Sequence, residues 1–157
     1  MNAMVKSKFS LAYKDESLAA LVNKTSHKTL GAWAVDCAER VLPFFEEKYP
    51  KDPRPRDAIA ALRKWIRTGV FKMAVIRKAS LDAHAAAREV GEDNAARSAA
   101  RAAGQAVATA HVPAHSLGAA NYALQAVYRA AGSDADAAVA EERAWQYRRL
   151  LDLTKSA

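Results

Sequence analysis

Two arginines and a glutamine recur at four-residue intervals in a segment that otherwise consists largely of alanine. Arg97, Arg101 and Gln105 would share one face of an α-helix, because residues four apart lie above one another on its surface. The preceding segment carries His84 and Arg88 at the same spacing. In an antiparallel hairpin, His84 would lie level with Arg101, and Arg88 with Arg97. Guanidinium, imidazole and amide groups gathered in this way favour the binding of an anion or an acidic side chain.

The segment that follows extends this polar group. Asn121 and Gln125 are again four residues apart. An antiparallel turn near Pro113 would place Asn121 level with Gln105. The same turn would place Gln125 level with Arg101. Burying charged groups costs free energy unless they are paired, so this face is solvated, paired within the protein, or part of a pocket that a ligand fills.

Asp36 and Arg40 form another polar pair at helical spacing, and we include them among the candidate binding residues. Structural ion pairs and solvated side chains explain most patterns of this kind, and a ligand or partner site is the alternative. Four acidic residues could neutralise the arginines internally, namely Asp36, Glu39, Asp82 and Glu89.

His111 and His115 are also four residues apart, a spacing that can hold a metal ion on one helical turn. Pro113 lies between them, however, and interrupts regular helical geometry. Histidines at a helix end, where they favour the negative end of the helix dipole, are the commoner case. We therefore keep both as candidate binding residues and predict neither a metal site nor a cofactor.

Nucleophilic chemistry finds little support in the sequence. Cys37 lies on the same apolar helical stripe as Trp33 and Val41, which indicates a buried structural cysteine. There is no glycine-rich phosphate loop and no serine nucleophile elbow. We assign no catalytic residue.

The balance of charge is basic, with 24 Lys and Arg against 17 Asp and Glu and a net charge of +7. This favours acidic partners. Nucleic acid is a weaker candidate, because the basic residues form no block and the alanine-rich segments offer few aromatic rings for stacking on bases. In the basic and aromatic stretch at 63–67, we expect Trp65 to pack inward while the charges point outward.

The elements that must position these residues are all helical. About a quarter of the chain is alanine, the strongest helix former, and no segment alternates with the period of a strand. We predict an all-α bundle of six to seven helices built from three antiparallel hairpins, with the alanine-rich fifth helix at its centre. The second helix of each hairpin carries an arginine, at Arg63, Arg101 and Arg143. This pattern indicates either a weak internal repeat or only the similar composition of alanine-rich helices. The expected helices span about residues 15–23, 26–49, 53–69, 71–90, 92–110, 114–131 and 135–153.

Residues 1–157 are expected to form a single domain, in which 1–13 is a loose N-terminal arm. No stretch is apolar enough for a signal peptide or a membrane span. The single cysteine suits a reducing compartment, so we expect a cytoplasmic protein.

Four ordered stretches resemble the immunity proteins of bacterial polymorphic toxin systems, and the resemblance covers about residues 27–130. They are WAVDCAERVLP at 33–43, DPRPRDAI at 52–59, AHAAARE at 83–89 and AARAAGQAVATAH at 99–111. The resemblance implies a protein that binds a toxin and blocks it without chemistry of its own. It marks as family-like Asp36, Arg40, Arg56, His84, Arg88, Arg101, Gln105, His111 and His115.

The preferred interpretation is therefore a non-catalytic binding protein of the immunity type, whose partner is a toxin or another acidic protein. One alternative is a helical enzyme or ligand-binding protein that uses a pocket of His, Arg and Asp, with or without a metal. A second alternative is a basic helical protein that binds nucleic acid. The sequence makes no prediction of the oligomeric state.

Overall fold

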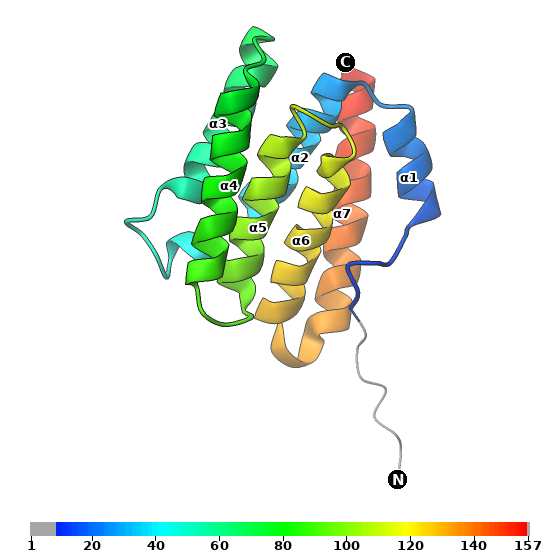
Figure 1. The fold of residues 1–157 in the computed structure, drawn as a ribbon. Coiled ribbons are helices and arrows are strands. Elements are labelled where there is room, and N and C mark those ends of the chain that lie inside the picture. The colour runs from blue at the N-terminus through cyan, green and yellow to red at the C-terminus, as the bar shows by residue number, and fades with distance from the viewer. Residues whose placement is uncertain (1–8, 157) are drawn as a thin grey trace.

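A computed structural model describes residues 9–156, and it confirms the all-α prediction (Figure 1). The described residues form seven α-helices and one short 3-10 turn at 132–134, with no strand among them. The α-helices are α1 (Glu16–Asn23), α2 (His27–Glu46), α3 (Arg54–Thr68), α4 (Met73–Glu89), α5 (Ala95–Ala108), α6 (His115–Ala130) and α7 (Ala135–Ser156).

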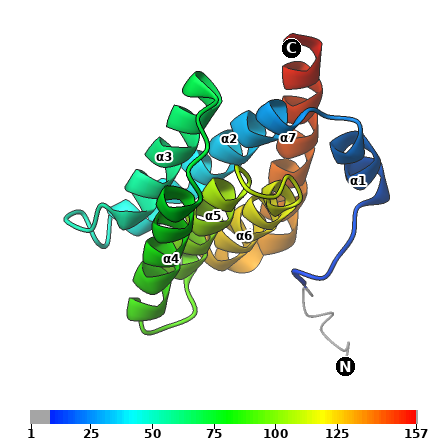
Figure 2. The same cartoon turned by 45° about the horizontal axis from the view of Figure 1, so that its top comes forward.

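Helices α2 to α7 run up and down, and neighbours among them in the sequence lie side by side, while α1 lies at the edge of the bundle (Figures 1 and 2). Helices α4, α5 and α6 form one layer, which covers α2 and α3, and α7 lies against α6 and α2. Burial of the large side chains of α2 and α3 against α5 builds the core. The largest of these fully buried side chains are Trp33, Leu42, Phe45, Ile59 and Leu62.

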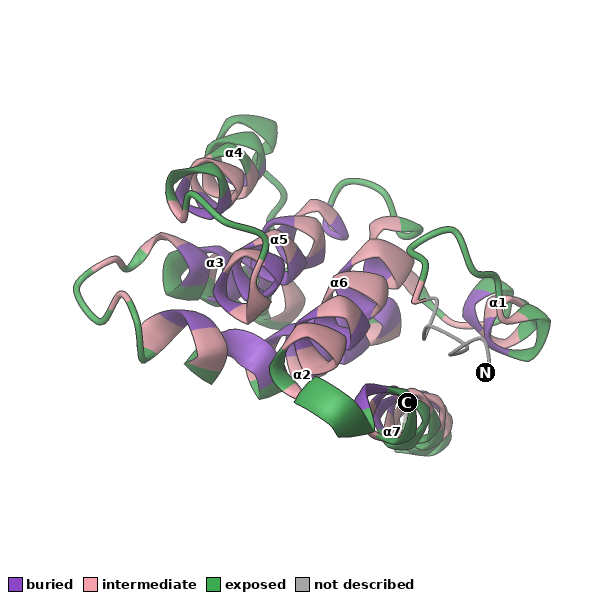
Figure 3. Cartoon of the chain, turned by 90° about the horizontal axis from the view of Figure 1, so that it is seen from below, coloured by how far each residue is buried: buried purple, intermediate pink, exposed green. Residues whose placement is uncertain are grey.

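Helix α5 lies at the centre of the bundle, as its composition predicts (Figure 3). It packs against α2, α3, α4 and α6. Alanine, glycine and serine occupy nearly all of its buried positions, and Val107 is the only large residue among them. Small side chains let helix axes approach closely, which is why four helices can contact this one.

The helix boundaries follow the capping signals in the sequence. The side chains of Asp15, Ser26 and Asn94 each accept a hydrogen bond from a backbone N–H in the first turn of α1, α2 and α5. Gly69 ends α3 with a left-handed φ of 70°. Helix α2 ends at Glu46, earlier than expected, and passes into hydrogen-bonded turns up to residue 49.

Part of the predicted N-terminal arm, residues 1–8, lies outside the described residues. The described part of it contacts the bundle. The ring of Phe9 stacks on Tyr128 of α6 with centroids 5.5 Å apart. The guanidinium of Arg143 on α7 lies 4.5 Å above the ring of Tyr13.

The three hairpins do not repeat one another's polar contacts. The arginines that suggested an internal repeat have three kinds of partner: Arg63 pairs with Glu39, Arg101 with His84, and Arg143 with Tyr13. Alanine-rich amphipathic helices therefore look alike in sequence, while each hairpin here makes its own set of side-chain contacts.

Helix α4 begins without a cap, which gives a stability prediction. Its N-cap residue, Lys72, has extended backbone but no side-chain hydrogen bond to the first turn, and that turn contains no acidic residue. Lys72→Asp should raise the free energy of unfolding by about 1 kcal/mol, because aspartate accepts from a free N–H and favours the positive helix end. Urea unfolding measures this change. Lys72→Ala is the control, and equal stability of the two variants would show that the α4 start gains nothing from a cap.

Candidate functional site

The polar residues of α5 form one partly exposed stripe along an otherwise buried helix. We call Arg97, Arg101 and Gln105 the α5 stripe, and all three lie at intermediate exposure. The residues between them are fully or almost fully buried. Their common face confirms the four-residue spacing argument.

Arg101 contacts His84, as the predicted hairpin geometry requires. The Nη1 of Arg101 lies 2.8 Å from the Nδ1 of His84. Because a guanidinium can only donate, Nδ1 accepts and the ring proton is assigned to Nε2. Burial, followed by the positive charges of Arg101 and Arg88, lowers the pKa of His84 to about 4. His84 is therefore neutral at pH 7.

A glycine makes room for this imidazole between α4 and α5. A Cβ atom placed on Gly104 would lie 2.7 Å from the Nε2 of His84 and 2.9 Å from two of its ring carbons. The ring thus packs directly on the α5 backbone. The hydroxyl of Ser80 adds a second α4–α5 contact by donating to the carbonyl of Gly104 at 3.0 Å.

The same arrangement occurs on the other side of α5. The Nδ1 of His115 lies 2.9 Å from the Oε1 of Gln105. A Cβ atom on Gly118 of α6 would lie 2.6 Å from that same oxygen. Polar side chains therefore cross the α4–α5 and α5–α6 interfaces at glycine positions, and the imidazoles of His84 and His115 flank the stripe. Burial lowers the pKa of His115 below its ordinary value.

The predicted level of α6 against α5 is wrong by about one helical turn. Gln105 contacts His115 rather than Asn121, and Gln125 accepts a hydrogen bond from the hydroxyl of Ser98 at 2.8 Å rather than meeting Arg101. The reason is that α5 ends at residue 108 and the turn is centred near residue 111, not on Pro113. Asn121 lines a separate pocket beside α1 and α7.

Arg97 has a structural role at the end of α4. Its Nε donates to the carbonyl of Ala87 at 3.0 Å, and its Nη1 pairs with the carboxylate of Asp93 at 2.7 Å. It thereby adds a charged donor to the last turn of α4, where the carbonyl of Ala87 also accepts from the N–H of Val90. Its Nη2 also approaches the carbonyl of Arg88, which agrees with the predicted level of these two residues.

Asp36 and Arg40 lie apart from the α5 stripe, on the side where α2 meets α7. Asp36 pairs with Arg149 at 2.7 Å. Arg40 makes two hydrogen bonds to the carboxylate of Glu142, at 2.7 and 2.8 Å, and its guanidinium lies 3.9 Å above the ring of Trp145. Both candidates thus join α2 to α7, and the sequence alone gave no sign of these partners.

None of the carboxylates proposed to neutralise the arginines contacts Arg101. Within residues 9–156, neither Arg101 nor Arg88 has a carboxylate partner, and the only hydrogen bond from the Arg101 side chain goes to neutral His84. The four acids pair elsewhere: Asp36 with Arg149, Glu39 with Arg63, Asp82 with Lys78, and Glu89 with Arg54.

The remaining candidates show no arrangement for metal or nucleophilic chemistry. His111 is exposed and stacks on Phe71 with ring centroids 6.0 Å apart, while His115 contacts Gln105. In the part of the chain that the structure describes, no three His, Cys, Asp or Glu side chains are grouped to hold a metal ion. Cys37 is fully buried, and burial raises the pKa of its thiol well above the ordinary value.

A comparison with protein families now bears on these observations. The model of one family, described as "Imm-5 like putative immunity protein", matches residues 20–153. The chain belongs to this family. Membership of the Imm-5 like family confirms the resemblance to immunity proteins. It also indicates a toxin as the general kind of partner.

The other comparisons add no relative to the Imm-5 like assignment. Neither curated proteins nor solved structures gave a significant match. Among the described residues of this family member, no helix is both long and apolar enough to cross a membrane.

Sequence reasoning missed the glycines that admit the polar side chains. Gly104 and Gly118 are helical residues, and a glycine inside a helix costs up to about 1 kcal/mol relative to alanine. Because alanine would be more stable inside these alanine-rich helices, the presence of glycine indicates that another group packs closely at each position.

Proposed function

We propose that this Imm-5 like protein is a non-catalytic immunity protein that binds a toxin, and that the α5 stripe with Arg88 contacts an acidic surface of that toxin. One observation carries the proposal: the partly buried guanidinium of Arg101 lies beside a neutral imidazole and has no carboxylate partner within residues 9–156. A partly buried charge is stabilised by an opposite charge, and a partner's carboxylate would provide it.

The surroundings of Arg101 support an acidic partner. Arg88 is exposed on the neighbouring turn of α4 and is close enough to lower the pKa of His84 by its charge. The whole chain carries a net charge of +7. Charge of this sign attracts an acidic protein during encounter and speeds association.

The enzyme alternative gains less support from the same residues. A general base works best with a pKa near the operating pH. His84, the residue best placed for that role, has a pKa of about 4 and uses its Nδ1 to accept from Arg101. It is thus a weak base whose lone pair is already engaged.

The test takes as its probe a toxin domain from the protein's own host, identified by a gene that lies beside the gene of this protein, and measures the affinity for that domain. Arg101→Gln keeps a helix-forming side chain of similar reach but removes the charge. It should raise the dissociation constant about 30-fold or more, because losing one member of a partly buried charge pair reduces the free energy of binding by at least about 2 kcal/mol. Isothermal titration calorimetry gives the constant, and growth of cells that express the toxin gives the biological effect.

Arg148→Gln is the matched control, because it removes the same charge from an exposed position on α7, away from α4 and α5. Its affinity should stay within about twofold of the wild type, as expected for a remote surface charge. Equal loss in both variants would show that only net charge matters. A wild-type protein that forms no complex with the toxin would overturn the proposed function itself.

A further inference from the structure

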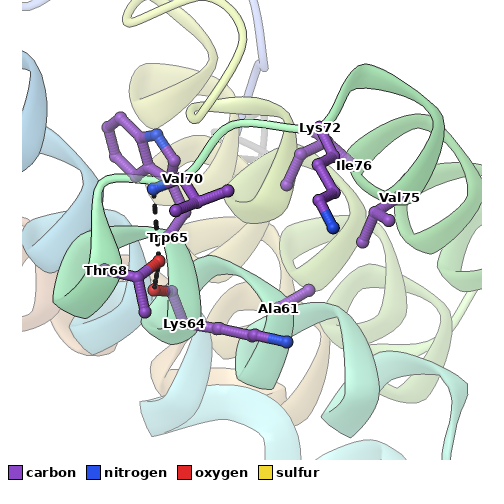
Figure 4. Close-up of a pocket in the computed structure, with 8 residues that line it drawn as sticks. All are labelled: Ala61, Lys64, Trp65, Thr68, Val70, Lys72, Val75 and Ile76. Carbon is purple, nitrogen blue, oxygen red and sulfur yellow. Dashed lines mark hydrogen bonds between the residues drawn. The ribbon is translucent and has the colours of Figure 1, made fainter.

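An apolar groove lies where the end of α3 meets the start of α4, apart from the α5 stripe (Figure 4). We call it the tip groove. Its volume is about 230 Å³, enough for one large or two small apolar side chains. Apolar side chains form most of its walls, and two lysines lie at its edge. The residues that line it include Lys64, Trp65, Val70, Lys72, Val75 and Ile76.

The groove is bordered by apolar side chains that nothing within residues 9–156 covers. Val70 is 59% exposed and Val75 is 52% exposed, and Phe71 and Met73 beside them are exposed as well. Four large apolar residues within one short segment form a patch rather than scattered single residues. Patches of this kind mark surfaces that another molecule contacts.

The groove is held open by contacts within its own loop. The hydroxyl of Thr68 donates to the carbonyl of Lys64 at 2.8 Å and accepts from the N–H of Val70 at 3.2 Å (Figure 4). These bonds fix the loop wall against α3. The buried side chains of Trp65 and Ile76 form the bottom of the groove. A partner therefore meets a preformed cavity, which lowers the entropic cost of binding.

The charge around the tip groove has one sign. Residues 58–81 contain six Lys and Arg and no Asp or Glu. Arg63 and Lys78 pair with acids that lie outside this segment. The start of α4 adds to the positive potential, since its first turn has neither a side-chain cap nor an acidic residue. No carboxylate within residues 9–156 pairs with the other four, which are Lys64, Arg67, Lys72 and Arg77.

From this complementarity we infer that the tip groove binds an acidic, apolar segment of the toxin partner. An apolar side chain of that segment fills the cavity, and flanking carboxylates meet Lys64, Lys72 and the free N–H groups at the start of α4. A second copy of this chain fits poorly, because a symmetric contact would bring the same lysines against one another. The inference rests on the proposed function and names the chemistry of the partner.

The tip groove lies near the Gln105 end of the α5 stripe, whereas Arg97 lies at the other end, where α4 ends. Phe71 at the groove stacks on His111, in the turn that joins α5 to α6. A few residues further on, His115 contacts Gln105 of the stripe. One toxin surface can therefore contact both, with apolar contacts at the tip and charge pairs along α5.

Val75→Glu is the sharpest test, because it damages the proposed contact without damaging the fold. Residue 75 is in the first turn of α4, where glutamate favours the positive helix end, so the variant should be as stable as the wild type. In the groove, the same substitution places a carboxylate where the partner's acids should lie. Affinity for the toxin used in the first test should fall about tenfold or more, as for a residue at the centre of an interface.

The matched control is Leu11→Glu, an equally drastic change at an exposed apolar residue beside α1 and α6, away from the tip. It should leave the affinity unchanged within about twofold, as substitutions outside an interface do. Hydrogen exchange supplies an independent readout, since toxin binding should slow exchange of the amides at 69–76 in the wild type.

The outcomes separate the two proposals. Suppose that the wild type binds the toxin, and that Arg101→Gln lowers the affinity while Val75→Glu leaves it unchanged. The tip groove inference is then overturned and the proposed function stands. If the wild type does not bind the toxin, both are overturned. Duplex DNA and anionic lipid vesicles serve as further probes at low salt. Binding to either that Val75→Glu abolishes, with toxin affinity intact, would assign the groove to that partner instead.

Discussion

Gly104→Ala should destabilise the protein by about 1 kcal/mol, although alanine is the better helix former. The added Cβ would lie 2.7 Å from the Nε2 of His84, closer than packed atoms approach. Overpacking a helix interface costs about 1–3 kcal/mol, while replacing glycine by alanine inside a helix returns about 1 kcal/mol. The clash should exceed the gain, because the His84 ring is rigid and can yield only by leaving Arg101.

A double-mutant cycle isolates the clash from the helix propensity. In the His84→Ala background the imidazole is absent, so Gly104→Ala should now stabilise by about 1 kcal/mol. The coupling free energy between the two positions is then about 2 kcal/mol, within the range for residues in contact. Urea unfolding of the four proteins measures it. A coupling near zero would mean that the ring does not pack on the α5 backbone.

Gly118 offers a comparison on the other side of α5. The atom that its Cβ would approach is the Oε1 of Gln105, at the end of a flexible side chain. That amide can swing away at the cost of its hydrogen bond to His115. The coupling between Gly118→Ala and Gln105→Ala should therefore be smaller than the coupling at Gly104.

Local signals account for the parts of the fold that were predicted. Helix periodicity, the caps at Ser26 and Asn94, and the stop at Gly69 are determined by neighbours in the chain. The pairing of His84 with Arg101 could also be predicted from the sequence. Once the short turn at 91–93 is recognised, antiparallel geometry leaves little freedom in which residues lie level.

Contacts that depend on the rotation and level of distant helices could not be predicted. The α5–α6 level depends on where α5 ends, and a shift of the turn by two residues moved Gln125 from Arg101 to Ser98. Asp36 and Arg40 point at α7 rather than at α5. Their partners lie more than 100 residues away, and nothing in the local sequence specifies them.

The tip groove was missed for a different reason. The apolar residues from Val70 to Val75 look like the start of an ordinary amphipathic helix, whose apolar face would be buried. Only the structure shows that these side chains stay exposed where α4 begins beside the end of α3. The absence of acids between 58 and 81 was readable from the sequence, but it gains meaning only beside an open cavity.

The second large effect expected is a dependence of stability on pH that originates at His84. Its pKa is about 4 in the folded protein and 6.5 in the unfolded chain. Between these values the unfolded chain binds more protons, so the free energy of unfolding falls as pH falls from about 6.5 to 4. The shift corresponds to at most about 3 kcal/mol. Since the ring is partly exposed, we discount this to about 2 kcal/mol for screening by solvent.

His84→Gln should remove that part of the pH dependence, and urea unfolding at pH 7 and pH 4 measures the loss. Acidic groups with lowered pKa values, such as Asp52, also lower the free energy of unfolding as the pH falls toward 4. Only the difference between the variant and the wild type therefore reports on His84. NMR titration of the His84 ring provides the direct check. A midpoint near 6.5 in the folded protein would contradict the burial of a neutral imidazole here.

Arg101→Gln tests the electrostatic cause and connects it to binding. Removing this guanidinium should raise the pKa of His84, and burial, the larger cause, should still hold it below 6.5. A carboxylate of a bound toxin would act in the same direction, because it stabilises the protonated ring. Binding should therefore take up a proton at mildly acidic pH, and affinity should rise as pH falls toward 4, provided that the toxin's own carboxylates remain ionised.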